Sequence, residues 1–142
     1  MTDIDRLSAE VVDGAMRIHR DLGPGLLESV YEAVLAVSLE RAGLRVERQK
    51  PIDIVFEGLQ IPAAFRADLI VEGRLVVEIK SVERLSRVHG KQLLTYLRLT
   101  QQPLGLLINF GSETLKEGLK RIVNDYRPSA SPRLRVKSEY GD

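Results

Sequence analysis

The chain has 142 residues, of which 44% are hydrophobic and 5% aromatic, and its formal net charge is +1. These values fit one globular domain with an aliphatic core, and the near-neutral charge does not by itself indicate a nucleic-acid-binding protein. The chain has no cysteine, which excludes disulfides, thiolate metal sites and a cysteine nucleophile and suits the reducing cytoplasm that we expect. We expect neither a secretion signal nor a membrane span, because no segment approaches the roughly 20 apolar residues that a span requires.

Hydrophobic periodicity predicts the secondary structure along the chain. Apolar residues recur at helical spacing in the first third of the chain, and alternation replaces that spacing where strands are expected. The expected helices span 7–20, 26–42, 84–100 and 112–126, and the expected strands span 45–57, 63–71, 75–81 and 104–110. The resulting order α-α-β-β-β-α-β-α indicates an α/β layered domain over residues 1–126. Residues 127–142 contain prolines and several basic side chains, which favour a flexible, basic and polar C-terminal tail.

The two central strands form a hairpin in which apolar and polar residues alternate. We expect its apolar residues to face the core together: Phe65, Ala67, Leu69, Val71, Leu75, Val77 and Ile79. That requirement sets the register, because a slip of one residue would turn a strand over. The expected pairs are Val71 with Leu75, Leu69 with Val77, and Ala67 with Ile79. In this register Asp68 faces Glu78, which requires a three-residue turn or a bulge near Gly73.

Two facing carboxylates repel each other, so something must offset the repulsion between Asp68 and Glu78. A divalent cation would do so, and Mg²⁺ is commonly held by one or two carboxylates together with substrate phosphate. Lys80 lies on the same face as Glu78, where it could orient or deprotonate a water molecule and stabilise charge on a phosphate. The alternative is an exposed sheet face with weak ion pairs, because an acid followed later by Glu-x-Lys is common.

The predicted helices contribute weaker candidates. Gln92 and Tyr96 are four residues apart and share a helix face. They could bind phosphate or a water molecule that is coordinated to a metal. A surface Gln and a half-buried Tyr are nevertheless the usual fate of such residues. Glu28 near a helix start is favoured by the helix dipole without any function. His19 could be a ligand, but a lone histidine on an amphipathic helix is more often structural.

Several of these segments, taken together, resemble a known family. The matching segments are GLLESVY at 25–31, Asp68, EIK at 78–80, QLLTY at 92–96 and LGLLINF at 104–110. The first resembles the signature of the GxxExxY proteins, and the others resemble the PD-(D/E)xK nuclease core with its following Gln-x-x-x-Tyr motif. Over about Val11 to Val123, the resemblance implies a restriction-endonuclease-like core, with a mixed β-sheet flanked by α-helices. Ala67 stands at the motif's proline position, which varies widely in the superfamily.

The resemblance implies a nuclease that hydrolyses phosphodiester bonds in DNA or RNA with Mg²⁺ or Mn²⁺. The implied metal ligands are Glu28, Asp68, Glu78 and the backbone carbonyl of Ile79, and His19 matches a position where some related nucleases have a ligating histidine. The implied catalytic residues are Lys80, Asp68 and Glu78, with Gln92 and Tyr96 positioning the substrate.

The implied partner is nucleic acid and not a membrane. A homodimer is an alternative to a monomer, because small nucleases of this class often dimerise. One alternative is a non-catalytic nucleic-acid-binding or regulatory module on the same fold. Another is a metal-free protein-interaction domain. Only the nuclease hypothesis requires both metal binding and strand cleavage.

Overall fold

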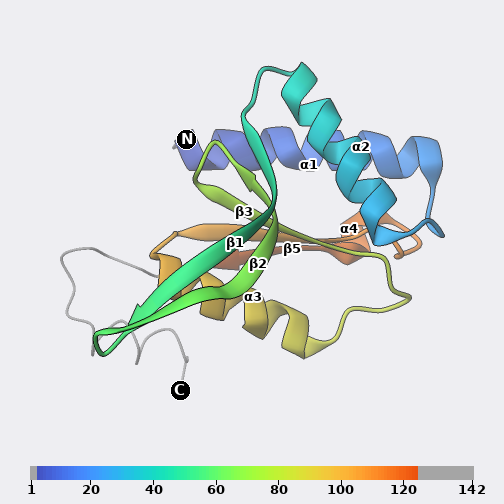
Figure 1. The fold of residues 1–142 in the computed structure, drawn as a ribbon. Coiled ribbons are helices and arrows are strands. Elements are labelled where there is room, and N and C mark those ends of the chain that lie inside the picture. The colour runs from blue at the N-terminus through green and yellow to red at the C-terminus, as the bar shows by residue number, and fades with distance from the viewer. Residues whose placement is uncertain (1–2, 125–142) are drawn as a thin grey trace.

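The computed structural model describes residues 3–124 (Figure 1), and the expected tail at 127–142 lies outside the described residues. The elements in chain order are α1 (Asp3–Leu22), α2 (Glu28–Arg41), β1 (Val46–Phe56), β2 (Leu59–Val71), β3 (Leu75–Lys80), α3 (Arg87–Thr100), β4 (Leu104–Asn109), α4 (Leu115–Gly118) and β5 (Leu119–Val123). Up to α4 this is the expected order of elements. None of the helices in the described range is long and apolar enough to cross a lipid bilayer.

The strands form one mixed sheet in the order β1-β2-β3-β4-β5. Strands β3 and β4 run parallel, whereas the other neighbouring pairs are antiparallel. A parallel pair needs a crossover connection, which α3 supplies between β3 and β4. Helices α1 and α2 lie over one face of the sheet and α3 lies over the other (Figure 1). The structure therefore confirms the expected α/β fold, a mixed sheet flanked by helices.

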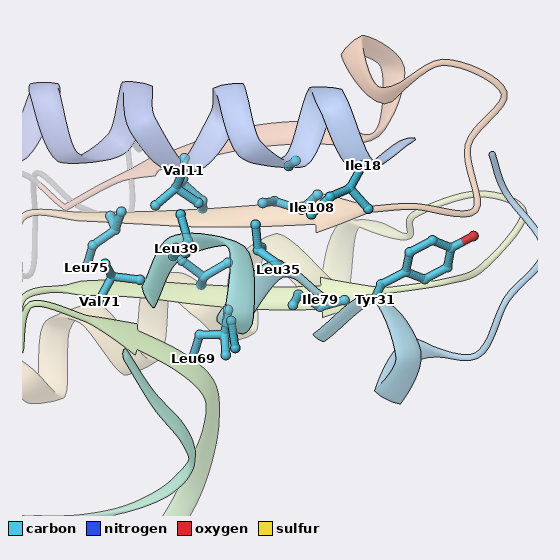
Figure 2. Packing of buried hydrophobic residues seen from close by; sticks show 14 of the residues in the cluster. Val11, Ile18, Tyr31, Leu35, Leu39, Leu69, Val71, Leu75, Ile79 and Ile108 are labelled. Carbon is cyan, nitrogen blue, oxygen red and sulfur yellow. The ribbon is translucent and has the colours of Figure 1, made fainter. Parts of the chain in front are cut away.

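Each face of the sheet has its own hydrophobic core. Beneath α1 and α2, side chains from both helices pack against β3 and β4 (Figure 2), among them Val11, Ile18, Leu35, Leu39, Leu75, Ile79 and Ile108. Beneath α3, a second cluster contains Phe65, Ala67, Ile70, Val76, Leu93, Leu97 and Leu107. Because helices cover both faces, β3 and β4 are buried along almost their whole length.

The expected register of the central hairpin is confirmed at two of its three pairs, but Ala67 does not pair with Ile79. The expected common face is wrong for Phe65 and Ala67. The observed pairs are Val71 with Leu75, Ile70 with Val76 and Leu69 with Val77, around the three-residue turn 72–74. Leu69 and Val71 pack beneath α1 and α2. Phe65 and Ala67 instead pack beneath α3. The apolar residues do not need to share one face, because both faces of the sheet are covered and β2 separates from β3 at Asp68.

The expected last helix over 112–126 is wrong in its described part, where it is a single turn, α4, followed by strand β5. A Cβ at Gly118 would lie 2.4 Å from the Asn109 carbonyl oxygen and 2.5 Å from Ser112 Oγ, so the chain passes too close to β4 for any side chain. Leu119 and Ile122 are three residues apart, as on one helix face, yet they pack against the two different cores. In a strand an odd spacing puts side chains on opposite faces, and both faces are apolar here.

Candidate metal centre

The candidate site lies where the sheet splits between β2 and β3. These strands pair only as far as Leu69 and Val77, whereas β2 continues to pair with β1 out to the end of their hairpin. Beyond the split, the N–H of Ile79 donates to Asp68 Oδ2 at 2.8 Å instead of to a strand carbonyl. The N–H and C=O of one strand residue point to the same edge, so the Ile79 carbonyl also faces this gap.

Glu78 is buried beside Asp68, with only 9% of its surface exposed. Burial raises the pKa of Glu78 to about 8, and both the negative charge of Asp68 and a side-chain hydrogen bond with it act in the same direction. A hydrogen bond from the Asp68 backbone and the charge of Lys80 lower this pKa. Asp68 and Lys80 are therefore both close enough for their charges to act on Glu78.

Two residues of α3 reach the same place. Burial raises the pKa of Tyr96, the charges of Glu78 and Asp68 raise it further, and a hydrogen bond with the Gln92 side chain lowers it. The Tyr96 ring stacks on Phe65 of β2, with ring centroids 3.8 Å apart and planes 6° from parallel. The structure thus gathers five of the expected site residues: Asp68, Glu78, Lys80, Gln92 and Tyr96.

Among the described residues, no hydrogen bond or ion pair joins the two remaining expected side-chain ligands to Asp68 or Glu78. Glu28 is the first residue of α2 and is exposed. His19 is buried, and its Nε2 lies 2.9 Å from the carbonyl oxygen of Ser112, which joins α1 to the loop after β4. That hydrogen bond alone accounts for a buried histidine at this position.

The glycine-rich turn before α2 is attached to the end of β3. Tyr31 stacks on Phe110 of the core, and its hydroxyl donates to the Gly23 carbonyl and accepts from the N–H of Leu26. The Ser81 hydroxyl donates to the Leu26 carbonyl at 2.6 Å. The tyrosine of the GLLESVY segment therefore has a structural role, which is to hold this turn beside the candidate site.

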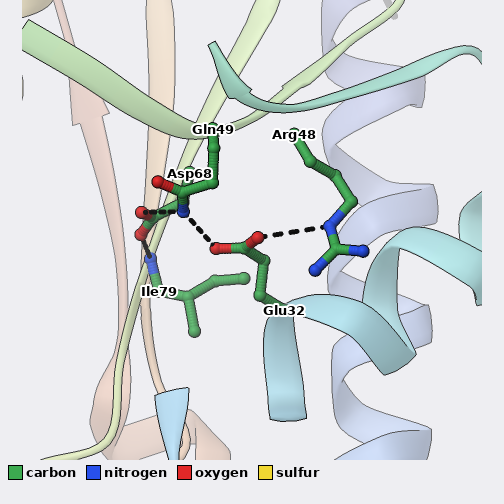
Figure 3. Close-up of polar contacts among 5 residues, drawn as sticks. All are labelled: Glu32, Arg48, Gln49, Asp68 and Ile79. Carbon is green, nitrogen blue, oxygen red and sulfur yellow. Dashed lines mark hydrogen bonds and ion pairs between the residues drawn. The ribbon is translucent and has the colours of Figure 1, made fainter. Parts of the chain in front are cut away.

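Glu32, which is not among the residues expected from the sequence, is connected to Asp68 through Gln49. Glu32 is only 6% exposed, and its two carboxylate oxygens accept from Arg48 Nε at 3.2 Å and from Gln49 Nε2 at 2.6 Å. The same Gln49 nitrogen donates to Asp68 Oδ1 at 3.2 Å (Figure 3). The sequence did contain a signal, because Glu32 lies in the buried stripe of α2, three residues before Leu35.

The donor set at the split suits a divalent cation. Glu78 Oε1 is buried and has no hydrogen-bond partner, and the carboxylate of Asp68 lies beside it. Such an orphaned oxygen is costly unless a proton or a cation satisfies it. Among residues 3–124, no three His, Asp or Glu side chains form a cluster that could hold a metal by themselves. Two carboxylates are nevertheless a usual protein contribution to Mg²⁺, whose other positions are filled by water and substrate phosphate.

A family comparison agrees with this geometry. Residues 5–122 match the family model described as the PD-(D/E)XK nuclease superfamily. The chain belongs to the PD-(D/E)XK nuclease superfamily, since the match covers most of its length. No curated protein and no solved structure matches the chain significantly.

Proposed function

We propose that this protein is a metal-dependent nuclease that hydrolyses phosphodiester bonds in DNA or RNA with Mg²⁺ or Mn²⁺. One observation carries the proposal: in a chain of this superfamily, the buried Glu78 keeps an unsatisfied carboxylate oxygen beside Asp68. The proposal includes membership of the GxxExxY proteins, which the resemblance of residues 25–31 to their signature supports. The proposal also includes action in the cytoplasm, nucleic acid as the partner, and a homodimer as an arrangement that would bring two sites to one duplex.

Each residue of the site has a proposed role. Asp68, Glu78 and the Ile79 carbonyl hold the cation, which when bound supplies Lewis-acid stabilisation of the phosphate and a more acidic attacking water. Lys80 orients or deprotonates that water and offsets charge that develops on the phosphate. Gln92 and Tyr96 position the phosphate, and the stack on Phe65 fixes where the Tyr96 hydroxyl lies.

Two acids of α2, Glu28 and Glu32, are candidates for a role at the cation. The resemblance alone supports Glu28, and it alone supports His19 as a further ligand. Glu32, one turn after Glu28, is linked to Asp68 through a single amide nitrogen. We therefore favour Glu32 over Glu28 as the helical acid that influences the cation.

The test is a cleavage assay on labelled single- and double-stranded DNA and RNA in Mg²⁺, Mn²⁺ or EDTA. Asp68→Asn removes the charge but can still accept the Ile79 hydrogen bond, so we expect a folded protein without cleavage. Asp53→Asn is the matched control, because Asp53 lies on β1 and accepts a hydrogen bond from the Ala63 N–H at 2.8 Å. We expect that variant to cleave normally.

Three results would overturn the proposal. Binding of nucleic acid without cleavage in either metal would indicate the non-catalytic module instead. Neither binding nor cleavage of any substrate would indicate that the carboxylates form an ordinary polar face. Cleavage that persists in EDTA would show that the reaction does not use a metal.

A further inference from the structure

Gln49 has an unusual backbone for a residue inside a strand. Its φ is 51°, in the left-handed region that favours glycine. The neighbouring pairs of the β1–β2 ladder are Arg48 with Leu69 and Lys50 with Ala67, so Gln49 lies opposite Asp68 in the register. A conformation of this kind costs free energy and persists only where the surrounding structure enforces it.

The side chain of Gln49 uses that conformation to bridge two carboxylates. Its Nε2 donates to Glu32 Oε1 at 2.6 Å and to Asp68 Oδ1 at 3.2 Å (Figure 3). A carboxylate only accepts hydrogen bonds when ionised, so the nitrogen end of the amide must face both acids. The amide oxygen could not occupy this place without facing two negative groups.

Both oxygens of Asp68 are thereby held. The N–H of Ile79 donates to Oδ2 at 2.8 Å, while Gln49 donates to Oδ1. The position of Gln49 is in turn supported by α2, because Glu32 accepts from Gln49 and is paired with Arg48 at 3.2 Å. The orientation of the Asp68 carboxylate beside Glu78 consequently depends on a residue that is not itself a candidate ligand.

We propose that Gln49 is a positioning residue of the metal centre, whose amide holds the Asp68 carboxylate in the orientation that binds the cation. The inference rests on the proposed function, since it assigns a role at the same site. Partners that orient metal ligands in this way typically affect metal affinity by about 10–100-fold.

The left-handed backbone provides a variant that removes the amide without straining the fold. Gln49→Gly deletes both hydrogen bonds and puts at φ 51° the residue that best tolerates it. Ala63→Gly is the matched control, because Ala63 also has a left-handed backbone, with φ 49°, and lies on the same hairpin. Any effect of glycine itself at such a position should appear in both variants.

The experiment combines three measurements on each protein. Calorimetric Mn²⁺ titration should show affinity about 10–100-fold weaker for Gln49→Gly and unchanged for Ala63→Gly. Amide hydrogen exchange of the metal-free protein should show faster exchange at the Ile79 N–H in Gln49→Gly alone. Cleavage by Gln49→Gly should recover largely when Mn²⁺ is raised to saturation, while its melting temperature stays at or above that of the wild type.

The outcomes separate this inference from the proposed function. If the wild type binds Mn²⁺ and cleaves, but Gln49→Gly has the same affinity and the same Ile79 exchange, Gln49 does not position Asp68. If Gln49→Gly mainly lowers the melting temperature and binds Mn²⁺ normally, its role is structural and the inference is wrong. If the wild type does not bind Mn²⁺, the proposed function fails and the inference fails with it.

Discussion

The pKa of Glu78 predicts that the metal-free protein loses stability as the pH rises. The pKa of this carboxyl is 4.5 in the reference state and about 8 in the folded protein, mainly because of burial. Between these values the folded state binds a proton that the unfolded state has released. The contribution of protonated Glu78 to the free energy of unfolding is therefore fully present below pH 4.5, and it is lost as the pH rises through about 8.

The size of the loss follows from the shift in pKa. At about 1.4 kcal/mol per pKa unit, the shift corresponds to roughly 5 kcal/mol, of which about 4 kcal/mol should be lost between pH 5 and pH 9. For a chain of 142 residues that loss lowers the melting temperature by on the order of 10 °C. A Glu78→Gln variant keeps the shape and the hydrogen-bonding capacity of the protonated acid, so its stability should lack this dependence.

Thermal unfolding in EDTA at half-unit steps from pH 5 to pH 9 measures the effect. Wild type and Glu78→Gln should melt together near pH 5 and separate as the pH rises, with the variant more stable. Glu113→Gln is the control, since Glu113 is exposed and its substitution should follow the wild-type curve. A constant difference between wild type and Glu78→Gln at every pH would refute the reasoning. Added Mn²⁺ should stabilise the wild type most at high pH, where Glu78 is ionised without competition from a proton.

Three further predictions concern individual side chains. Lys80→Met should lower cleavage by about 10²–10⁴-fold while Mn²⁺ affinity stays the same or rises, whereas Asp68→Asn should lose both; wild-type cleavage by Lys80→Met would contradict the assigned role. His19→Ala should cost about 1–3 kcal/mol in urea unfolding, because it leaves a buried carbonyl without its donor, and should not change Mn²⁺ affinity; a weaker affinity would support a ligand role instead. Glu32→Gln should weaken Mn²⁺ affinity, measured by calorimetry, more than Glu28→Gln does. The reverse order would indicate that Glu28 is the acid of α2 that influences the cation.

The local sequence determined most of the elements and the register of the central hairpin. Helix and strand positions follow from apolar spacing and from glycine and proline at the turns, which act over a few residues. The pairing of Leu69 with Val77 could be derived from the alternation of apolar residues, because Leu69, Val71, Leu75 and Val77 do share one core, the one beneath α1 and α2. That register places Asp68 near Glu78, so the centre of the candidate site was within reach of sequence reasoning.

The tertiary structure decided the features that depend on distant neighbours. Strand β5 forms because the chain after Gly118 meets the free edge of β4 and two apolar layers, which no local pattern reveals. The pKa of Glu78 depends on burial beneath α3, which neighbouring sequence does not encode. Gln49 joins Glu32 to Asp68 only because α2 lies beside the split between β2 and β3 and because one strand residue adopts a left-handed backbone. Periodicity identifies the face on which a side chain lies, but the position of one element over another is set by packing of the whole core.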